Sequence, residues 1–331
     1  MRILFGFYSG IGDLLSAIPI INNVKTNIKV SIAITENLID VLKIFDVRYD
    51  SLIVFDRSKL SRANIKFSKS LNDSPFDYIV YSPHATYEHS SFYLPILLKI
   101  FKNPSTKIIG AKHQKNSWLF DETVEVKFMQ KCSYREYDLV NCINIIEDIN
   151  KDSLCNFTPT MKKYTSEVNK NNSICLHIGA SRKSKRLSDK FWSLLIKKFY
   201  DNTDYKLRII GLEQEISSLR EMLSGLRNKV DFFSGNMEES VKILSQSEFV
   251  ITMDSGFGHI ASLMRLNHFC IFVSSSPLMF APIFSNTKIL YKPGEPCQPC
   301  LSRTCYESNM YCLANLEPNH VYNHIVTFMR K

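Results

Sequence analysis

The sequence predicts an α/β protein made of two doubly wound domains, each with a parallel sheet covered by helices. Short apolar runs alternate with helix-like stretches along the chain of 331 residues. Most of these runs are continuous rather than alternating, as in strands that are buried on both faces. A chain of this length can form two cores. Its 45% apolar and 22% charged residues are typical of globular proteins and exclude disordered, collagen-like and coiled-coil chains.

The expected elements follow each other as strand and helix, which predicts parallel sheets. Strands are expected in the first half at Ile3–Tyr8, Lys29–Ile34, Leu52–Phe55, Tyr78–Tyr81 and Lys107–Ile109. Strands are expected in the second half at Ile174–Ile178, Leu207–Ile210, Phe249–Met253 and Phe269–Val273. Helices are expected at Leu14–Val24, Asp189–Tyr200, Gln214–Leu223, Met237–Ser245 and Gly258–Leu266.

The alternation is weakest between Lys151 and Asn172, where the sequence becomes polar and rich in Lys and Asn. We therefore predict a first domain over residues 1–160 and a second over residues 161–316. Residues 317–331 should form a helix that packs back on the body. Ligands of such sheets bind beyond the carboxyl ends of the strands, so two domains that face each other would enclose a cleft.

The charge balance points to an anionic partner. Lys and Arg number 41 against 32 Asp and Glu, a formal net charge of +9, which suits nucleic acid, a phosphorylated small molecule or an anionic membrane face. Clustered aromatic residues and nucleic-acid motifs are absent from the sequence, so no nucleic-acid partner is expected. No apolar run is long enough to span a membrane. Asp13 interrupts the apolar start and no cleavage site follows it, which predicts a cytoplasmic protein.

The first candidate motif links the opening strand to the first helix and reads Ser9-Gly10-Ile11-Gly12-Asp13. Glycines at such a turn permit a tight backbone and the close approach of a ligand. The dinucleotide fingerprint Gly-x-Gly-x-x-Gly is incomplete, because position 15 is Leu. Asp13 is therefore either the N-cap of the helix or a catalytic carboxylate, and the spacing leaves both open.

The second motif follows the first strand of the second half and reads His177-Ile178-Gly179-Ala180-Ser181-Arg182-Lys183-Ser184-Lys185-Arg186. Small residues with a cluster of cations form a cradle suited to a diphosphate. A solvated basic loop is the alternative. The position of the motif at the carboxyl end of a buried strand favours the ligand-binding interpretation over the solvated loop.

The third motif again joins a strand to a helix and reads Asp254-Ser255-Gly256-Phe257-Gly258-His259. Small residues leave backbone N–H groups open at a helix N-terminus, which is an anion site. As alternatives, Asp254 or Ser255 caps the helix and His259 is a buried polar residue. Glu213 and Glu215 follow another strand, where a carboxylate either binds ribose hydroxyls or stabilises the helix dipole.

A fourth motif groups four of the nine cysteines in one short segment: Cys297, Cys300, Cys305 and Cys312. Four thiolates at this density suit a structural zinc or iron site. Two disulfides or reduced thiols are the alternatives, and a cytosolic location argues against the disulfides. Four protein ligands would leave no open position for catalysis.

Together these motifs resemble glycosyltransferase family 9, the ADP-heptose:lipopolysaccharide heptosyltransferases. The opening segment from Arg2 through Gly10–Leu15 to Pro19 is similar to the family's first strand and loop. The second and third motifs are similar to its phosphate loop and its nucleotide-sugar signature, although Leu187-Ser188 replaces the usual Trp-Pro. The Cys-rich segment is similar to a segment in some members. Residues 55–152, which would contribute to the acceptor side, carry no motif that can be recognised as the family's.

The resemblance implies the glycosyltransferase-B architecture of two Rossmann-like domains. The N-terminal domain would hold the acceptor and the C-terminal domain the nucleotide sugar. Asp13 would be the catalytic base, and Lys185 would both assist catalysis and hold the donor diphosphate with Ser181. The remaining expected donor-binding residues are Gly10, Gly12, Glu215, Asp254, Ser255, Gly256 and His259.

The resemblance also implies an inverting transfer from an ADP-heptose-like donor to a hydroxyl of a lipopolysaccharide or lipooligosaccharide core, or of another surface glycan. The sequence has no Asp-x-Asp motif, so protein cations should replace a catalytic divalent metal and no catalytic cofactor is expected. A peripheral contact with the cytoplasmic face of the inner membrane fits a glycolipid acceptor. Alternatives are a relative with another nucleotide sugar or a protein acceptor, and an inactive nucleotide-binding protein of the same fold.

Overall fold

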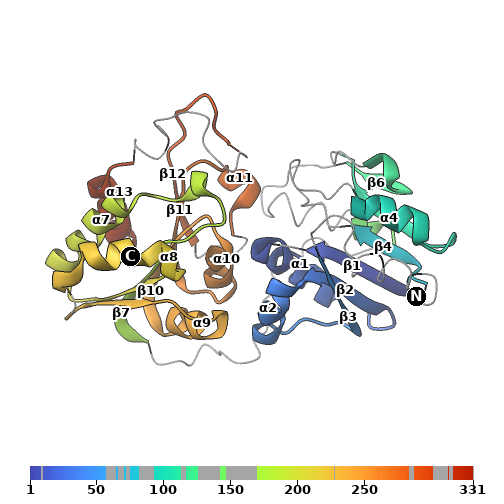
Figure 1. Cartoon of the computed structure of the whole chain (residues 1–331), viewed down its shortest axis with the longest axis horizontal. Coiled ribbons are helices and arrows are strands. Elements are labelled where there is room, and N and C mark those ends of the chain that lie inside the picture. Colours follow the sequence, from blue (N-terminus) through green and yellow to red (C-terminus); the bar gives the residue numbers. More distant parts are fainter. Residues whose placement is uncertain are drawn as a thin grey trace. The chain divides into compact units, whose positions relative to one another are not determined.

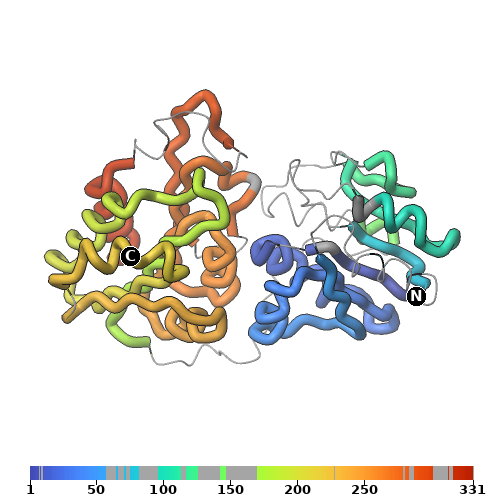
Figure 2. Tube along the Cα trace, viewed as in Figure 1, coloured from blue at the N-terminus to red at the C-terminus, as the bar shows by residue number. Residues whose placement is uncertain are grey.

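The computed structural model of the chain divides into two compact units, Met1–Lys162 and Lys163–Lys331. The structure describes residues 1–8, 10–56, 65, 71, 75–81, 93–112, 117–125, 142–146, 170–226, 228–282, 287–300, 312 and 316–330, which are coloured in Figure 2. The boundary predicted between residues 160 and 161 lies outside these residues, so it stays a prediction.

The first unit is built on a six-stranded sheet in the order β3-β2-β1-β4-β5-β6 (Figure 1). Every pair of neighbouring strands in it is parallel. The strands are β1 (Arg2–Tyr8), β2 (Lys29–Thr35), β3 (Ser51–Phe55), β4 (Tyr78–Tyr81), β5 (Lys107–Ala111) and β6 (Glu122–Val124). The described helices are α1 (Ile11–Asn23), η1 (Glu36–Leu38), α2 (Ile39–Ile44), α4 (Tyr93–Phe101) and η2 (Ser117–Leu119).

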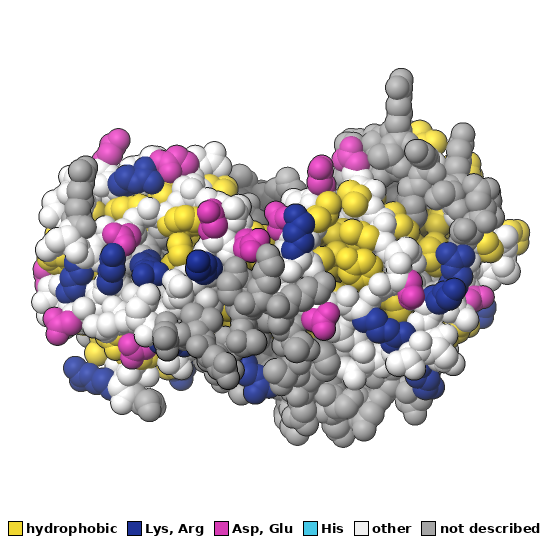
Figure 3. Space-filling view, turned by 90° about the horizontal axis from the view of Figure 1, so that it is seen from below, with side chains coloured by type: hydrophobic (Ala, Val, Ile, Leu, Met, Phe, Trp, Pro, Cys, Tyr) yellow, Lys and Arg dark blue, Asp and Glu magenta, His cyan; other side chains and the backbone are white. Residues whose placement is uncertain are grey.

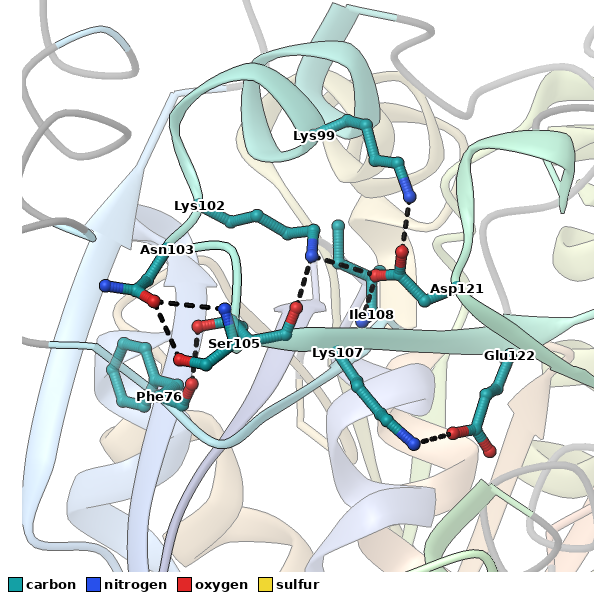
Figure 4. A network of polar contacts seen from close by, with 10 residues as sticks. Phe76, Lys99, Lys102, Asn103, Ser105, Lys107, Ile108, Asp121 and Glu122 are labelled. Atoms are coloured by element: carbon teal, nitrogen blue, oxygen red, sulfur yellow. Dashed lines mark hydrogen bonds and ion pairs between the residues drawn. The ribbon is translucent and has the colours of Figure 1, made fainter.

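Asp121 holds α4 and β5 together at one side of the first unit. Its carboxylate pairs with Lys99 of α4 and, at 3.2 Å, with Lys102, and it accepts a 2.8 Å hydrogen bond from the backbone N–H of Ile108 (Figure 4). Burial opposes ionisation, but the hydrogen bonds from Lys99 and Ile108, with the charge of Lys102, lower the pKa of Asp121. One carboxylate therefore joins a helix to the sheet it covers.

The second unit repeats the same topology, with strands in the order β12-β11-β10-β7-β8-β9 and all neighbouring pairs parallel. Its strands are β7 (Asn171–His177), β8 (Lys206–Ile210), β9 (Val230–Phe233), β10 (Ser247–Met253), β11 (Asn267–Phe272) and β12 (Thr287–Tyr291). Its described helices are η3 (Lys183–Lys185), α7 (Asp189–Asn202), α8 (Glu213–Met222), η4 (Ser224–Leu226), α9 (Met237–Gln246), α10 (Gly256–Leu263), α11 (Pro277–Phe280) and α13 (Pro318–Met329).

Alternate residues of the central strand β7 are buried under different helices. Ile174 and Leu176 lie in one core cluster with α7, α8 and α13, whereas Cys175 lies in another with α9 and α10. Both faces are thus apolar, which explains the continuous hydrophobic run in the sequence. The two doubly wound sheets predicted from such runs are confirmed.

Helices begin where the sequence supplies caps. Ser188 accepts a hydrogen bond from Phe191 N–H at the start of α7, and Asn236 accepts one from Glu239 N–H at the start of α9. Such caps stabilise a helix by about 1 kcal/mol each. At the C-terminus, α13 lies against α7 (Figure 1). Tyr322 of α13 and Phe199 of α7 make an edge-to-face contact there.

The chain order of each sheet reverses next to its first strand. In the first unit β2 and β3 lie on one side of β1 and β4 to β6 lie on the other, and in the second unit β7 and β10 meet at the equivalent place. Ligands of doubly wound sheets bind at the carboxyl ends of the strands that flank such a switch point. Among the described helices, none has the length and apolar character needed to cross a bilayer.

Candidate active site

The loops that follow β7 and β10 lie at the switch point of the second sheet. The first of them contains the predicted phosphate loop, and the second contains Asp254 and the start of α10. These segments are far apart in the sequence but adjacent in the sheet, because β7 pairs with β10 from Ser247↔Asn171 to Thr252↔His177. The fold thus brings two of the predicted motifs together.

An ion pair between Lys185 and Asp254 links the two loops. Lys185 Nζ lies 2.5 Å from Asp254 Oδ2, and the two side chains are 12% and 6% exposed. Ser275, in the loop after β11, donates its hydroxyl to the same carboxylate oxygen. Lys185 also lies 5.1 Å from the centre of the Phe280 ring of α11. The lysine of the predicted basic loop is therefore fixed in place and is not a freely solvated charge.

Asp254 is ionised despite its burial. Burial acts to raise its pKa, but the charge and hydrogen bond of Lys185, the Ser275 hydroxyl and the nearby His259 lower the pKa below its ordinary value. His259 is itself buried, at 6% exposure. A buried carboxylate that fixes a lysine can orient the lysine's remaining N–H donors toward an anion, since an ammonium group carries three donors.

The N-terminus of α10 has no side-chain cap. Ser255 occupies the N-cap position without a cap hydrogen bond, and its Oγ lies 3.4 Å from His177 Nδ1 instead. The His177 ring stacks on Phe257 with centroids 4.3 Å apart, and burial lowers the pKa of His177 to about 4, so the ring is neutral. Ser255 is therefore the N-cap residue by position, but the prediction that its side chain caps the helix is wrong. Gly256 begins the helix beside it.

Glu215 holds the phosphate loop against α8. Its Oε2 accepts a 3.0 Å hydrogen bond from Leu212 N–H, and its Oε1 lies 3.0 Å from Arg186. A Cβ on Gly179 would lie only 2.4 Å from Glu215 Oε2, so this glycine permits the close approach. Glu215 thus caps α8 and also bridges to the loop, whereas the exposed Glu213 pairs with Arg220. Ser181 is exposed in the same loop.

Asp13 lies in the first unit, in the first turn of α1. The helix N-cap is Gly10, so the interpretation of Asp13 as the N-cap is wrong. A Cβ on Gly10 would lie 2.7 Å from Asp13 Oδ2, which means that the carboxylate lies directly over Gly10 and that any larger residue there would displace it. Gly12 accepts a 2.8 Å hydrogen bond from Ser16 Oγ through its carbonyl group.

The Cys-rich segment is attached to the loop after β11, the loop whose Ser275 contacts Asp254. Cys300 N–H donates a 2.6 Å hydrogen bond to Ser274 O, next to Ser275, and Gln298 Nε2 donates to Val273 O. Of the four cysteines, Cys297 is exposed, Cys300 and Cys312 are half-buried, and Cys305 lies outside the described residues. Among the described side chains, no three His, Cys, Asp or Glu residues are grouped to hold a metal ion. A four-cysteine metal site stays a prediction.

Ser275 and Phe280 are site residues that sequence reasoning did not select, whereas His177 and Arg186 stood in the second motif without a role of their own. Ser275 and Phe280 come from the segment after β11, where a run of serines gives no charge or glycine signal. Their position on the switch-point side of the sheet could have been found only from the strand order.

A family model for glycosyltransferase family 9 (heptosyltransferase) matches residues 65–311, well over half of the chain. The chain belongs to this family. It is therefore a glycosyltransferase. A comparison with curated protein sequences found no significant match.

Solved structures of two heptosyltransferases and of another family 9 glycosyltransferase share the fold over 99% of the chain. Escherichia coli heptosyltransferase WaaC with ADP is 13% identical with a TM-score of 0.71, and the match covers 99% of this chain and 100% of that one. A family 9 glycosyltransferase from Veillonella parvula is 15% identical with a TM-score of 0.72, covering 99% and 96%. E. coli ADP-heptose lps heptosyltransferase II is 14% identical with a TM-score of 0.65, covering 99% and 98%. The glycosyltransferase-B fold of two Rossmann-like units is thus confirmed.

Proposed function

We propose that this glycosyltransferase moves a heptose or related sugar from an ADP-sugar to a hydroxyl of a lipopolysaccharide core or another surface glycan, with inversion at the anomeric carbon. The observation that carries the proposal is the Lys185–Asp254 ion pair at the switch point, beside the uncapped start of α10. Lys185 donors and helix N–H groups there suit a diphosphate. The solved relative WaaC, whose structure contains ADP, supports the choice of nucleotide.

Breaking a sugar–phosphate bond releases a nucleoside diphosphate, so negative charge develops on the leaving group. Lys185 and the N–H groups at the start of α10 would stabilise that charge, and fixed donors do so without reorganising. Asp254 and Ser275 keep the lysine in place. Protein cations would thus supply the charge that a divalent metal supplies elsewhere.

The acceptor hydroxyl must lose a proton as it attacks the anomeric carbon. We assign the Asp13 carboxylate as the general base that accepts this proton. General-base catalysis of this kind raises the rate about 10²–10⁴-fold. The first turn of α1 favours its ionised form, since the helix dipole stabilises negative charge there. The proposal requires Asp13 and the donor site to act on one donor–acceptor pair.

Titration with ADP tests the donor site. Lys185→Ala should weaken ADP binding about 10- to 100-fold, because it removes hydrogen bonds to a charged group. Lys183→Ala is the matched control, since Lys183 is exposed in the same short helix and should bind ADP as the wild type does. Equal binding by both variants would remove Lys185 from the site.

Transfer assays with ADP-heptose and a glycolipid acceptor test the base. Asp13→Asn should lower the rate about 10²–10⁴-fold while leaving the dissociation constant for ADP unchanged. Wild-type protein that binds ADP but never transfers or hydrolyses a sugar would indicate a nucleotide-binding protein that has lost catalysis. Transfer only from another nucleotide sugar would keep the mechanism and change the donor.

A glycolipid acceptor would place the enzyme at a membrane surface, where its net charge of +9 favours anionic lipid. On the face shown in Figure 3, Lys and Arg side chains are interspersed with Asp and Glu and do not form one basic patch. On that face the net charge, rather than a local basic patch, would attract the anionic lipid, and we propose that the contact is made on the cytoplasmic side.

A further inference from the structure

Two histidines lie one turn apart on the outer face of α13. His320 and His324 are both exposed, whereas Val321 and Ile325 on the same helix are fully buried. The spacing of four residues places both imidazole rings on one side of the helix. Their Nε2 atoms are 3.1 Å apart, and the ring centroids are 4.4 Å apart.

We propose that His320 and His324 form a two-ligand site for a divalent transition metal such as Zn²⁺, Ni²⁺ or Cu²⁺. Imidazole nitrogens bind zinc at about 2.0–2.1 Å. Two Nε2 atoms 3.1 Å apart would therefore subtend an angle of about 98° at a metal bound to both. That angle lies between the ideal values for octahedral and tetrahedral coordination, so the separation of the two nitrogens suits the binding of one ion by both rings once the rings turn toward it.

The packing of α13 fixes the backbone that carries the two histidines. Tyr322 packs edge-to-face on Phe199 of α7 with centroids 5.0 Å apart, and Phe328 contacts Phe249 and Phe269 of the sheet. Val321 and Ile325 are fully buried in the core of the unit. Because the backbone of α13 is fixed on the sheet, binding orders mainly the two side chains, which lowers its entropic cost.

The donor set selects the class of metal. Imidazole suits zinc, copper and nickel, whereas magnesium and calcium prefer oxygen ligands. The described residues offer no group of three His, Cys, Asp or Glu side chains at this place, so water or a second molecule would fill the remaining positions. One ring now donates to the other through Nε2.

Calorimetric titration of untagged protein with NiCl₂ and ZnCl₂ tests the site. Wild-type protein should bind one ion that His320→Ala and His324→Ala each bind about a hundredfold more weakly, because a chelate becomes a single ligand. Asn319→Ala, which alters an exposed neighbour on the same helix, is the matched control and should bind like the wild type. Mg²⁺ should give no heat that depends on the histidines.

Thermal melting gives a second measure of metal binding by the two histidines. Ni²⁺ should raise the melting temperature of the wild type and of Asn319→Ala but not of the two histidine variants, since a ligand that binds the folded state stabilises it. The double variant Cys297→Ser/Cys300→Ser should keep the ion that the histidines bind. Loss of that ion in the cysteine variant, or wild-type binding by both histidine variants, would overturn the proposal.

Discussion

Tyr8 ends β1 with a hydroxyl group that is buried and has no hydrogen-bond partner in the described part of the chain. Burial, together with nearby Cys142 and Asp13, raises the pKa of Tyr8, so the group is a neutral phenol. A buried hydroxyl without a partner costs about 1–3 kcal/mol. It is an unusual feature this close to the proposed catalytic base.

Replacing Tyr8 by Phe should therefore raise the free energy of unfolding by about 1 kcal/mol, because it removes an unsatisfied polar atom and keeps the ring. Urea unfolding monitored by circular dichroism measures the change. Tyr200→Phe is the control, since the Tyr200 hydroxyl donates a 3.0 Å hydrogen bond to Asn228 and its removal should give no gain. A loss of stability in Tyr8→Phe would show that the hydroxyl has a partner.

At the scale of elements, Asp121 joins α4, β5 and the turn after η2 through one carboxylate. Asp121→Ala should lower the free energy of unfolding by about 1–3 kcal/mol, because Ile108 N–H loses its charged acceptor and Lys102 loses a partner. The pKa of Asp121 is lowered in the folded state. Its contribution is therefore present above the unfolded pKa near 4 and is lost as the pH falls through the folded value.

The control for this prediction is Asp231→Ala. Asp231 pairs with Lys206 at 2.7 Å, but both side chains are about half exposed, so solvent screens the pair. Urea unfolding at pH 7 should show little change for Asp231→Ala and a clear loss for Asp121→Ala. Equal changes in the two variants would mean that the Asp121 network contributes no more than a surface ion pair.

The elements that the sequence predicted are those with long apolar runs. β1, β7 and β10 are buried on both faces and therefore read as continuous hydrophobic segments. The short edge strands β6 and β9 were not predicted, because a few residues that include Glu122 or Asp231 carry too little pattern. The helix α4 was also not predicted, because its sequence is strongly apolar and lacks the polar face that marks a surface helix.

The candidate site was predictable in the same uneven way. Lys185 and Asp254 stood in motifs that local chemistry marks as anion sites, and both belong to the switch point. Their direct pairing was not predictable, because 69 residues separate them and only the strand order brings them together. Ser275 was missed for the same reason, since its contact with Asp254 depends on β11 lying next to β10.

At the scale of the whole molecule, resistance to acid depends on buried neutral histidines. His268 is fully buried between β10 and β12, where its ring nitrogens lie 2.9 Å from Thr252 Oγ1 and 3.0 Å from Thr287 Oγ1. Burial, with the nearby His259, lowers the pKa of His268 from 6.5 to about 3. Below pH 6.5 the unfolded chain therefore binds a proton that the folded ring does not, and stability falls with pH until about pH 3.

His268→Gln should make that fall shallower. A single such group lowers the free energy of unfolding by about 1.4 kcal/mol for each unit that the pH falls. Between pH 6.5 and pH 5 the free energy of unfolding of the wild type should therefore fall by about 2 kcal/mol more than that of the variant. The variant should be less stable at pH 7, where it lacks the paired ring, and urea unfolding at both pH values separates the two effects. Asn319→Gln, an exposed change on α13 that adds and removes no titratable group, should keep the wild-type slope. Parallel pH profiles for wild type and His268→Gln would show that the buried ring accepts a proton without loss of the fold, and that the acid sensitivity of the molecule arises elsewhere.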